Sequence, residues 1–160
     1  MKIQEAIMEK NALKSKLKNV VSSFEFIFDG DNLSVAEKDR KNIISKSFGV
    51  LSQYTQLQAK IALKNSQVKV EFNSKSMTLI ELILHMQMLR QKVDILKEIK
   101  SKIQDSYNLS HYDSAAEPNP SILYEKRKLT EKVSEQIESV KEELRSAQSV
   151  LEKTNWTEDI

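Results

Sequence analysis

Apolar residues recur at steps of three and four along three of the four long segments of this chain. This spacing keeps apolar side chains on one face of an α-helix and is typical of antiparallel bundles and coiled coils. It predicts a mainly α fold, an antiparallel helical bundle of four long helices. The repeated positions are Ile3, Ala6, Leu13, Leu17, Val20, Phe24 and Ile27, then Leu82, Met86, Leu89, Val93 and Leu96, and finally Val133, Ile137, Val140, Leu144, Ala147 and Leu151.

Local signals predict the limits of the first two helices. The first is expected over about residues 2–22. Ser34 and Glu37 have the spacing of a capping box, which places the start of the second helix near Val35. Gly49 lies in the middle of the second helix, where it costs about 1 kcal/mol relative to alanine. Because glycine has no side chain, it permits another backbone to approach closely at this position.

The third and fourth helices have similar start signals. Thr78 and Glu81 repeat the capping-box spacing. The third helix is expected to begin there and to end near Ser106. Pro120 suits the first position of a fourth helix, because its missing amide proton is not needed there. This last helix is expected to continue to about Lys153.

A short alternating segment predicts a β element. Apolar and charged residues alternate from Val68 to Phe72, and the polar segment 73–76 reads as a loop. A lone strand of this length is unstable and needs a partner. The segment from Phe24 to Phe28 is the other alternating candidate. We therefore expect a short two-stranded β element formed by these two segments.

The sequence predicts a single helical domain over residues 1–160, which has three parts. Residues 1–107 hold the first three helices and the β element, residues 108–120 form a linker, and residues 121–160 form the C-terminal helix and a tail that contains Trp156. Exposing a tryptophan forfeits on the order of 2 kcal/mol. The side chain of Trp156 is therefore expected to dock and to hold the tail against the bundle.

Composition and charge exclude several classes of function for this protein. The chain has 39% hydrophobic and 30% charged residues, and its 25 basic and 23 acidic residues leave a net charge of +2. The densest basic cluster, 126–128, fans over about 200° of a helix and cannot form one phosphate-binding stripe, so nucleic acid is not expected as a partner. The sequence has no cysteine and no apolar run long enough for a transmembrane segment. A cytoplasmic location is expected.

Candidate catalytic chemistry is sparse. His85 lies between Leu84 and Met86 and is expected to be an interface or solvent-edge residue rather than an acid-base group. His111 lies in the linker beside Asp113. The sequence lacks a glycine-rich phosphate loop, a serine–histidine–aspartate order and a second metal ligand near either histidine. We predict no catalytic site, no metal site and no cofactor, and hence a protein that is not an enzyme.

Three segments of the chain follow a recognisable pattern: the opening residues 1–7 followed by Leu13 and Leu17, the strand-loop-helix segment 65–81, and the closing residues 155–157. Together they resemble a bacterial all-helical family whose members are often labelled septicolysin-like and are otherwise of unknown function. The resemblance covers most of the chain. The positions that match the family pattern are Asn65, Thr78, Leu79, Glu81, Asn155, Trp156 and Thr157.

The chain also departs from that family. Residues 73–76 replace an Asp-Gly turn, and Met86 and Gln87 replace an Arg-Asp pair, so any site built on that pair is lost here. A similar strand and helix start occurs in small phage-encoded helical proteins, and a phage origin is therefore a second option. The septicolysin label implies a toxin, but no catalytic motif comes with it.

Three functions follow from these observations. The first is a non-enzymatic helical binding or scaffold protein that forms homo-oligomers and can bind a protein partner. The second is a sequestering protein that holds a small anionic ligand between helices, with Tyr54, Arg90 and Lys92 as candidate ligand-binding residues. The third is a septicolysin-type membrane-active toxin that uses the apolar face of the third helix from Met77 to Leu89.

Overall fold

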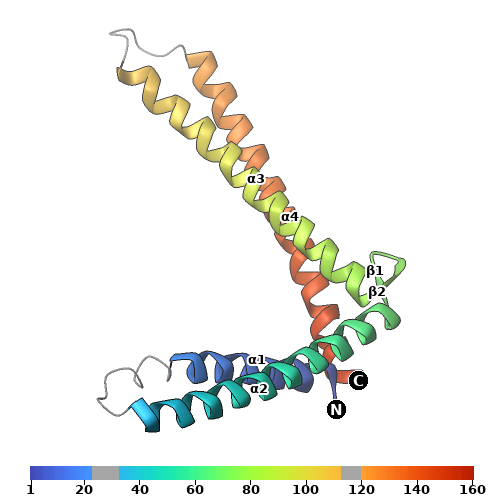
Figure 1. Cartoon of the computed structure of the whole chain (residues 1–160). Helices are drawn as coiled ribbons and strands as arrows, with labels where there is room; N and C mark the ends of the chain where they lie inside the picture. Colours follow the sequence, from blue (N-terminus) through green and yellow to red (C-terminus); the bar gives the residue numbers. More distant parts are fainter. Residues whose placement is uncertain (23–32, 113–119) are drawn as a thin grey trace. The chain divides into compact units, whose positions relative to one another are not determined.

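The protein is mainly helical and has one short β hairpin. The computed structural model describes residues 1–22, 33–112 and 120–160 (Figure 1). These residues confirm the predicted fold class of four helices and a two-stranded β element. The elements are α1 (Ile3–Ser22), α2 (Leu33–Gln67), β1 (Lys69–Phe72), β2 (Lys75–Thr78), α3 (Leu79–Tyr112) and α4 (Pro120–Thr157).

The starts of α3 and α4 agree with the local sequence signals, whereas α2 begins at Leu33, so Ser34 lies inside the helix and not at its cap. Helix α3 begins directly after Thr78, and α4 begins at Pro120. Both helices end later than predicted, α3 at Tyr112 and α4 at Thr157. Residues 108–112, which the sequence pattern assigned to the linker, are therefore helical. Trp156 belongs to α4 rather than to a separate tail.

The chain divides into two compact units. The division passes through the β hairpin, through the first turn of α3 and through the last turns of α4. The first unit comprises Met1–Val70, Thr78–Ile80 and Glu152–Ile160, and the second comprises Glu71–Met77 and Glu81–Leu151. The single domain expected from the sequence stays a prediction.

The partner of the first strand differs from the prediction. Strand β1 pairs with β2, which begins at Lys75, so the predicted loop over residues 73–76 is confirmed for Asn73 and Ser74 and is wrong for Lys75 and Ser76. Asn73 and Ser74 have φ angles of 49° and 60°. A two-residue connection with positive φ at both positions matches the twist of two antiparallel strands and closes a tight hairpin. The segment 24–28, which was the predicted partner, lies outside the described residues.

The first unit is built on the contact between α1 and α2, which lie side by side in Figure 1. Ala6 of α1 is fully buried against Leu57 and Ile61 of α2. A side chain as small as that of alanine lets the two helix backbones approach closely. Ile7, Leu13 and Ile160 are half-buried around this cluster.

Both ends of the chain join within the first unit. Lys2 forms an antiparallel β bridge with Asp159, and the amide of Ile3 donates to the carbonyl of Glu158 at 2.9 Å. The Nζ atom of Lys2 lies 2.7 Å from Oδ2 of Asp159 and also donates to the carbonyl of Thr157 at 2.8 Å. The hydrogen bond from Lys2 lowers the pKa of Asp159 from its ordinary value. The start of α1 is thereby tied to the end of α4.

The second unit is an antiparallel pair of helices, α3 and α4 (Figure 1). Val93 of α3 is buried against Val133 and Ile137 of α4. These are positions of the three-four pattern, so the pattern correctly identified the faces that meet. Leu96, Ile103 and Val140 are half-buried around them.

Candidate functional site

The three predicted ligand-binding residues lie in different parts of the chain. Tyr54 is half-buried on α2 in the first unit, whereas Arg90 and Lys92 are exposed on α3 in the second. Residues two positions apart on a helix point about 200° away from each other, so Arg90 and Lys92 do not share a face. None of these residues lines the pockets described below. Their role in binding an anion stays a prediction.

The closing Asn-Trp-Thr segment is buried at Asn155 and exposed at Trp156. Asn155 is only 7% exposed, whereas Trp156 is 56% exposed, and the predicted docking of the tryptophan side chain is wrong. The reason is that α4 continues through Thr157. Consecutive helical residues point about 100° apart, so the turn that directs Asn155 inward directs Trp156 outward.

The other residues of the family pattern lie near the junction of α2, the hairpin and α3. Asn65 is on α2, and its buried Oδ1 atom has no hydrogen-bond partner among the described residues. Such an oxygen costs about 1–3 kcal/mol. Thr78 immediately precedes α3, and Glu81 lies in the first turn of that helix, where the helix dipole favours a carboxylate.

A histidine–glutamate pair lies in the second unit. Nε2 of His85 on α3 is 2.9 Å from Oε1 of Glu143 on α4, and both side chains are half-buried. Nδ2 of Asn73 donates to the same glutamate oxygen at 3.4 Å, and the ring of Phe72 lies 5.7 Å from the imidazole. These contacts tie the hairpin turn to both helices. A positioned imidazole alone lacks the nucleophile or metal ligands that hydrolytic chemistry needs.

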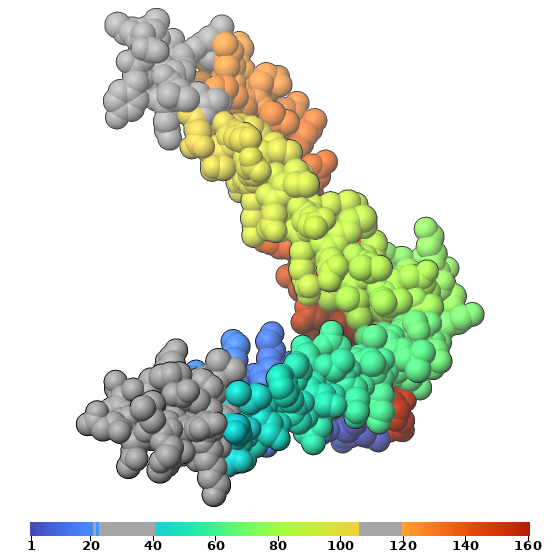
Figure 2. All heavy atoms as spheres, in the orientation of Figure 1, coloured from blue at the N-terminus to red at the C-terminus, as the bar shows by residue number. Residues whose placement is uncertain are grey.

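Helix α3 carries a second apolar surface, which we call the outer α3 face. It consists of Leu84 (57% exposed), Met88 (40%), Ile95 (57%) and Ile99 (42%). Atoms of α3 form the surface of the second unit on the side seen in Figure 2. At 100° per residue, the outer α3 face lies about 140° around the helix from the side that contacts α4. The helix therefore presents apolar side chains in two directions.

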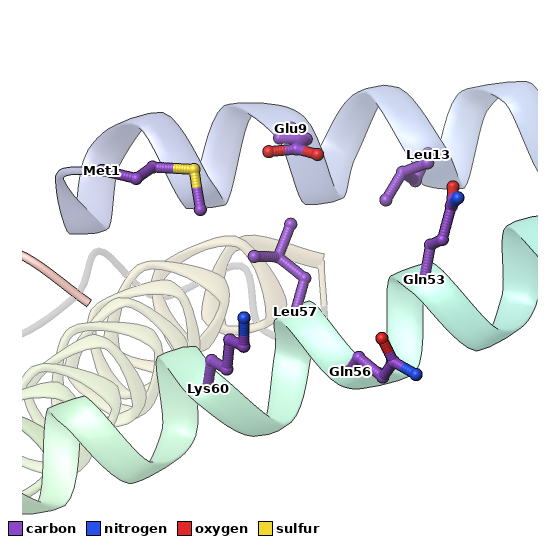
Figure 3. Close-up of a pocket in the computed structure, with 7 residues that line it drawn as sticks. All are labelled: Met1, Glu9, Leu13, Gln53, Gln56, Leu57 and Lys60. Carbon is purple, nitrogen blue, oxygen red and sulfur yellow. The ribbon is translucent and has the colours of Figure 1, made fainter.

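A first pocket of about 300 Å³ lies between α1 and α2 (Figure 3). Leu57 and Lys60 point from α2 toward α1, and Leu13 points back from α1. The lining includes one acidic residue, Glu9, and one basic residue, Lys60. The full lining is Met1, Glu9, Leu13, Gln53, Gln56, Leu57 and Lys60.

A second pocket of about 470 Å³, which we call the Gly49 pocket, adjoins the first, because Gln53 lines both. A Cβ atom placed on Gly49 would meet nothing within 4 Å. The close approach of another backbone, which this glycine would permit, does not occur among the residues that the structure describes. The pocket is lined by Lys16 and Val20 of α1 and by Lys46, Gly49, Val50 and Gln53 of α2.

A third pocket of about 230 Å³ lies in the second unit, between α3 and α4. Lys97, Lys100 and Lys141 make it basic, but Glu138 also lines it. The Nζ atom of Lys141 lies 2.6 Å from Oε1 of Glu138, so part of its positive charge is already paired.

The Gly49 pocket was missed because the balanced net charge hides an uneven distribution. No aspartate or glutamate occurs from Lys10 to Phe24 or from Lys41 to Val70. Two such segments that pair as helices create a local basic surface in a nearly neutral protein. Counting charge by segment would have revealed it.

The described residues contain no cluster of three or more histidine and acidic side chains that could hold a metal ion. Within the same residues, no helix has the length and apolar character required to cross a membrane. The resemblance to septicolysin-like proteins stays a prediction. No family model matches this chain, and neither the curated proteins nor the solved structures include a match.

Proposed function

We propose that this protein is a non-enzymatic helical scaffold that forms homo-oligomers through the outer α3 face. The observation that supports the proposal is that α3 carries apolar side chains on two sides. Its inner side packs on α4, while four large apolar side chains on the other side are 40–57% exposed. Together they expose on the order of 400 Å², which is within the range of the largest apolar patch on a typical monomer, and such patches are often functional.

The spacing of this face favours a second copy of the chain as the occupant. Leu84, Met88, Gln91 and Ile95 follow steps of four, three and four, as in a helix-helix seam. The steps are the same when read in either direction. An antiparallel second copy therefore sets Leu84 against the partner's Ile95, and Met88 against the partner's Gln91. A surface that is its own complement is what a twofold dimer requires.

The exposed area indicates a weak dimer. Two such faces would bury roughly 800 Å² of apolar surface, less than the 1,200–2,000 Å² of a standard interface. A polar rim adds area but little affinity. The dissociation constant is therefore expected in the micromolar range.

Sedimentation velocity from about 1 to 500 μM, a span chosen around a micromolar constant, tests the proposal. The wild-type protein is expected to convert from monomer to dimer across this range. Leu84→Ser should shift the transition to higher concentration, whereas Leu63→Ser, at an exposed apolar residue on α2, should not. A wild-type monomer at every concentration would contradict the proposal. Leakage of lipid vesicles that Leu84→Ser abolishes would assign the same face to a membrane instead.

The absence of cysteine from the chain permits a direct test of the antiparallel arrangement. An oxidised mixture of Leu84→Cys and Ile95→Cys should form a disulfide between the two variants. Leu84→Cys alone should not, because its two sulfur positions would lie about 16 Å apart along the helix axis. Cross-linking of the single variant would indicate a parallel dimer and would exclude the antiparallel one.

A further inference from the structure

Two lysines share the Gly49 pocket, and none of its described lining residues is acidic. The two lysines are Lys16 of α1 and Lys46 of α2. On each helix, the positions three and four residues before and after these lysines hold no aspartate or glutamate. Neither lysine forms an ion pair with another residue that the structure describes. Two ammonium groups at one pocket repel each other, and the attraction of both groups to a bound anion would offset that repulsion.

The surroundings of the pocket strengthen this field. Residues 10–22 of α1 and 41–67 of α2 carry lysines and no acidic residue. Fixed charges of one sign raise the local concentration of the opposite ion and increase its association rate. The lysines in these two segments are Lys10, Lys14, Lys16, Lys18, Lys41, Lys46, Lys60 and Lys64.

Gly49 has no role in packing that would explain its place in the middle of α2. A glycine inside a helix costs about 0.8–1.0 kcal/mol relative to alanine. The backbone of Gly49 does not have a positive φ, and a Cβ atom there would have open space within 4 Å. What the glycine does provide is room in the pocket. A residue that lowers helix stability and enlarges a pocket is typical of a binding site.

The remaining lining residues add an apolar surface and a neutral polar group. Val20 and Val50 lie on the two helices, and the amide of Gln53 can donate or accept hydrogen bonds. A ligand that satisfies all of these groups has an anionic head and an apolar body. The pocket of the second unit lacks this combination, because Glu138 lines it and pairs with Lys141.

We propose that the Gly49 pocket binds a small amphipathic anion, in which a phosphate or carboxylate is joined to a short apolar chain. Lys16 and Lys46 bind the anionic head, and Val20 and Val50 contact the apolar chain beside Gly49. The site is independent of the outer α3 face, and it uses residues other than Tyr54, Arg90 and Lys92.

Titration of the ¹⁵N-labelled full chain, followed through the amides of Gly49 and Val50, tests the proposal. The probes are hexyl phosphate and hexanoate, with inorganic phosphate and hexanol as comparisons. We expect saturable binding of an amphipathic probe with a dissociation constant below about 1 mM, at least about tenfold tighter than inorganic phosphate or hexanol. Saturable binding by either probe supports the proposal, and the tighter probe identifies the head group.

Variants separate the pocket from the general basic surface. Gly49→Leu places a side chain in the open space, so the protein should fold while binding weakens by at least about tenfold. Lys16→Gln and Lys46→Gln should each weaken binding by about fivefold or more, consistent with the loss of one charge-assisted hydrogen bond. Lys18→Gln, which removes the same charge outside the pocket, and Ser52→Leu, on an exposed side of α2, should leave binding within about twofold.

Several results would each overturn the proposal. They are the absence of saturable binding by both probes, equal binding of hexyl phosphate and inorganic phosphate, and unchanged binding in Gly49→Leu. Equal losses in Lys18→Gln and Lys16→Gln would also overturn it, because the anion would then respond to the basic surface as a whole. Circular dichroism of each variant confirms that the helices are retained.

Discussion

Replacing Gly49 with alanine should stabilise the protein. Alanine is favoured over glycine in a helix by about 0.8–1.0 kcal/mol. At most sites a steric term can cancel this gain, but here a Cβ atom would meet nothing within 4 Å. The backbone also has no positive φ that would penalise an L-amino acid. The free energy of unfolding is therefore expected to rise by nearly the full difference in helix propensity.

Urea unfolding followed by circular dichroism at 222 nm measures the change. With a dependence on urea of about 1–3 kcal/mol per molar, the midpoint should rise by about 0.3–1 M. Ser52→Ala is the matched control on an exposed side of the same helix. Its gain should be smaller, because serine is a better helix former than glycine.

The opposite result would refute the structural argument. If another backbone lay against Gly49, an added methyl group would force it away, and overpacking costs about 1–3 kcal/mol. A Gly49→Ala variant that is destabilised by this amount would therefore indicate that another backbone does lie against Gly49. It would also remove the space on which the ligand proposal rests.

Three further outcomes are expected. The hydrogen bond from Lys2 lowers the pKa of Asp159, so this contact stabilises the fold above the unfolded pKa of 3.8 and is lost as the pH falls through the lowered value. Protection of the Ile3 amide against hydrogen exchange should therefore decrease as the pH falls through that value. In Asp159→Asn, this protection should already be low at neutral pH. Ile137→Ala should reduce the free energy of unfolding in urea by about 2–4 kcal/mol, because this buried side chain joins α4 to α3. Leu84→Ser should weaken the dimer roughly 30- to 140-fold in sedimentation, since burying the exposed 57% of two leucines contributes about 2–3 kcal/mol.

The starts of α3 and α4 were predictable because their signals are local. The capping spacing of Thr78 and Glu81 places the start of α3, and Pro120 places the start of α4. The helix ends were less predictable. Tyr112 and Thr157 are followed by no glycine that would end a helix, so the pattern contained no clear stop.

The hairpin was missed because its turn lacks the residue that normally marks it. Positive φ at both central positions usually selects Asn-Gly, and here Ser74 stands where glycine is expected. Strand β2 is also short and largely polar, with exposed Lys75 and Ser76, and its pattern does not identify a buried strand face. The pairing of β1 with its neighbour is therefore visible only once the backbone is known.

Sequence periodicity could not predict the polar contacts between residues far apart in the chain. His85 and Glu143 are separated by 58 residues, and Lys2 and Asp159 by 157. Helix phase shows which side of an element is buried, but not which polar residue of a distant element lies opposite. The basic character of the Gly49 pocket is different, because the two acid-free segments that form it are present in the sequence and only their pairing as helices had to be known.

The two proposed surfaces have opposite chemistry, and this makes their tests independent. The outer α3 face consists of apolar side chains, whereas two copies of the Gly49 pocket would repel each other through Lys16 and Lys46. Dimer formation and anion binding should therefore respond to different variants. Leu84→Ser should weaken the dimer and leave the titration with hexyl phosphate unchanged, whereas Gly49→Leu should do the reverse. Loss of both properties in either variant would mean that one surface serves both, and the division of roles argued here would be wrong.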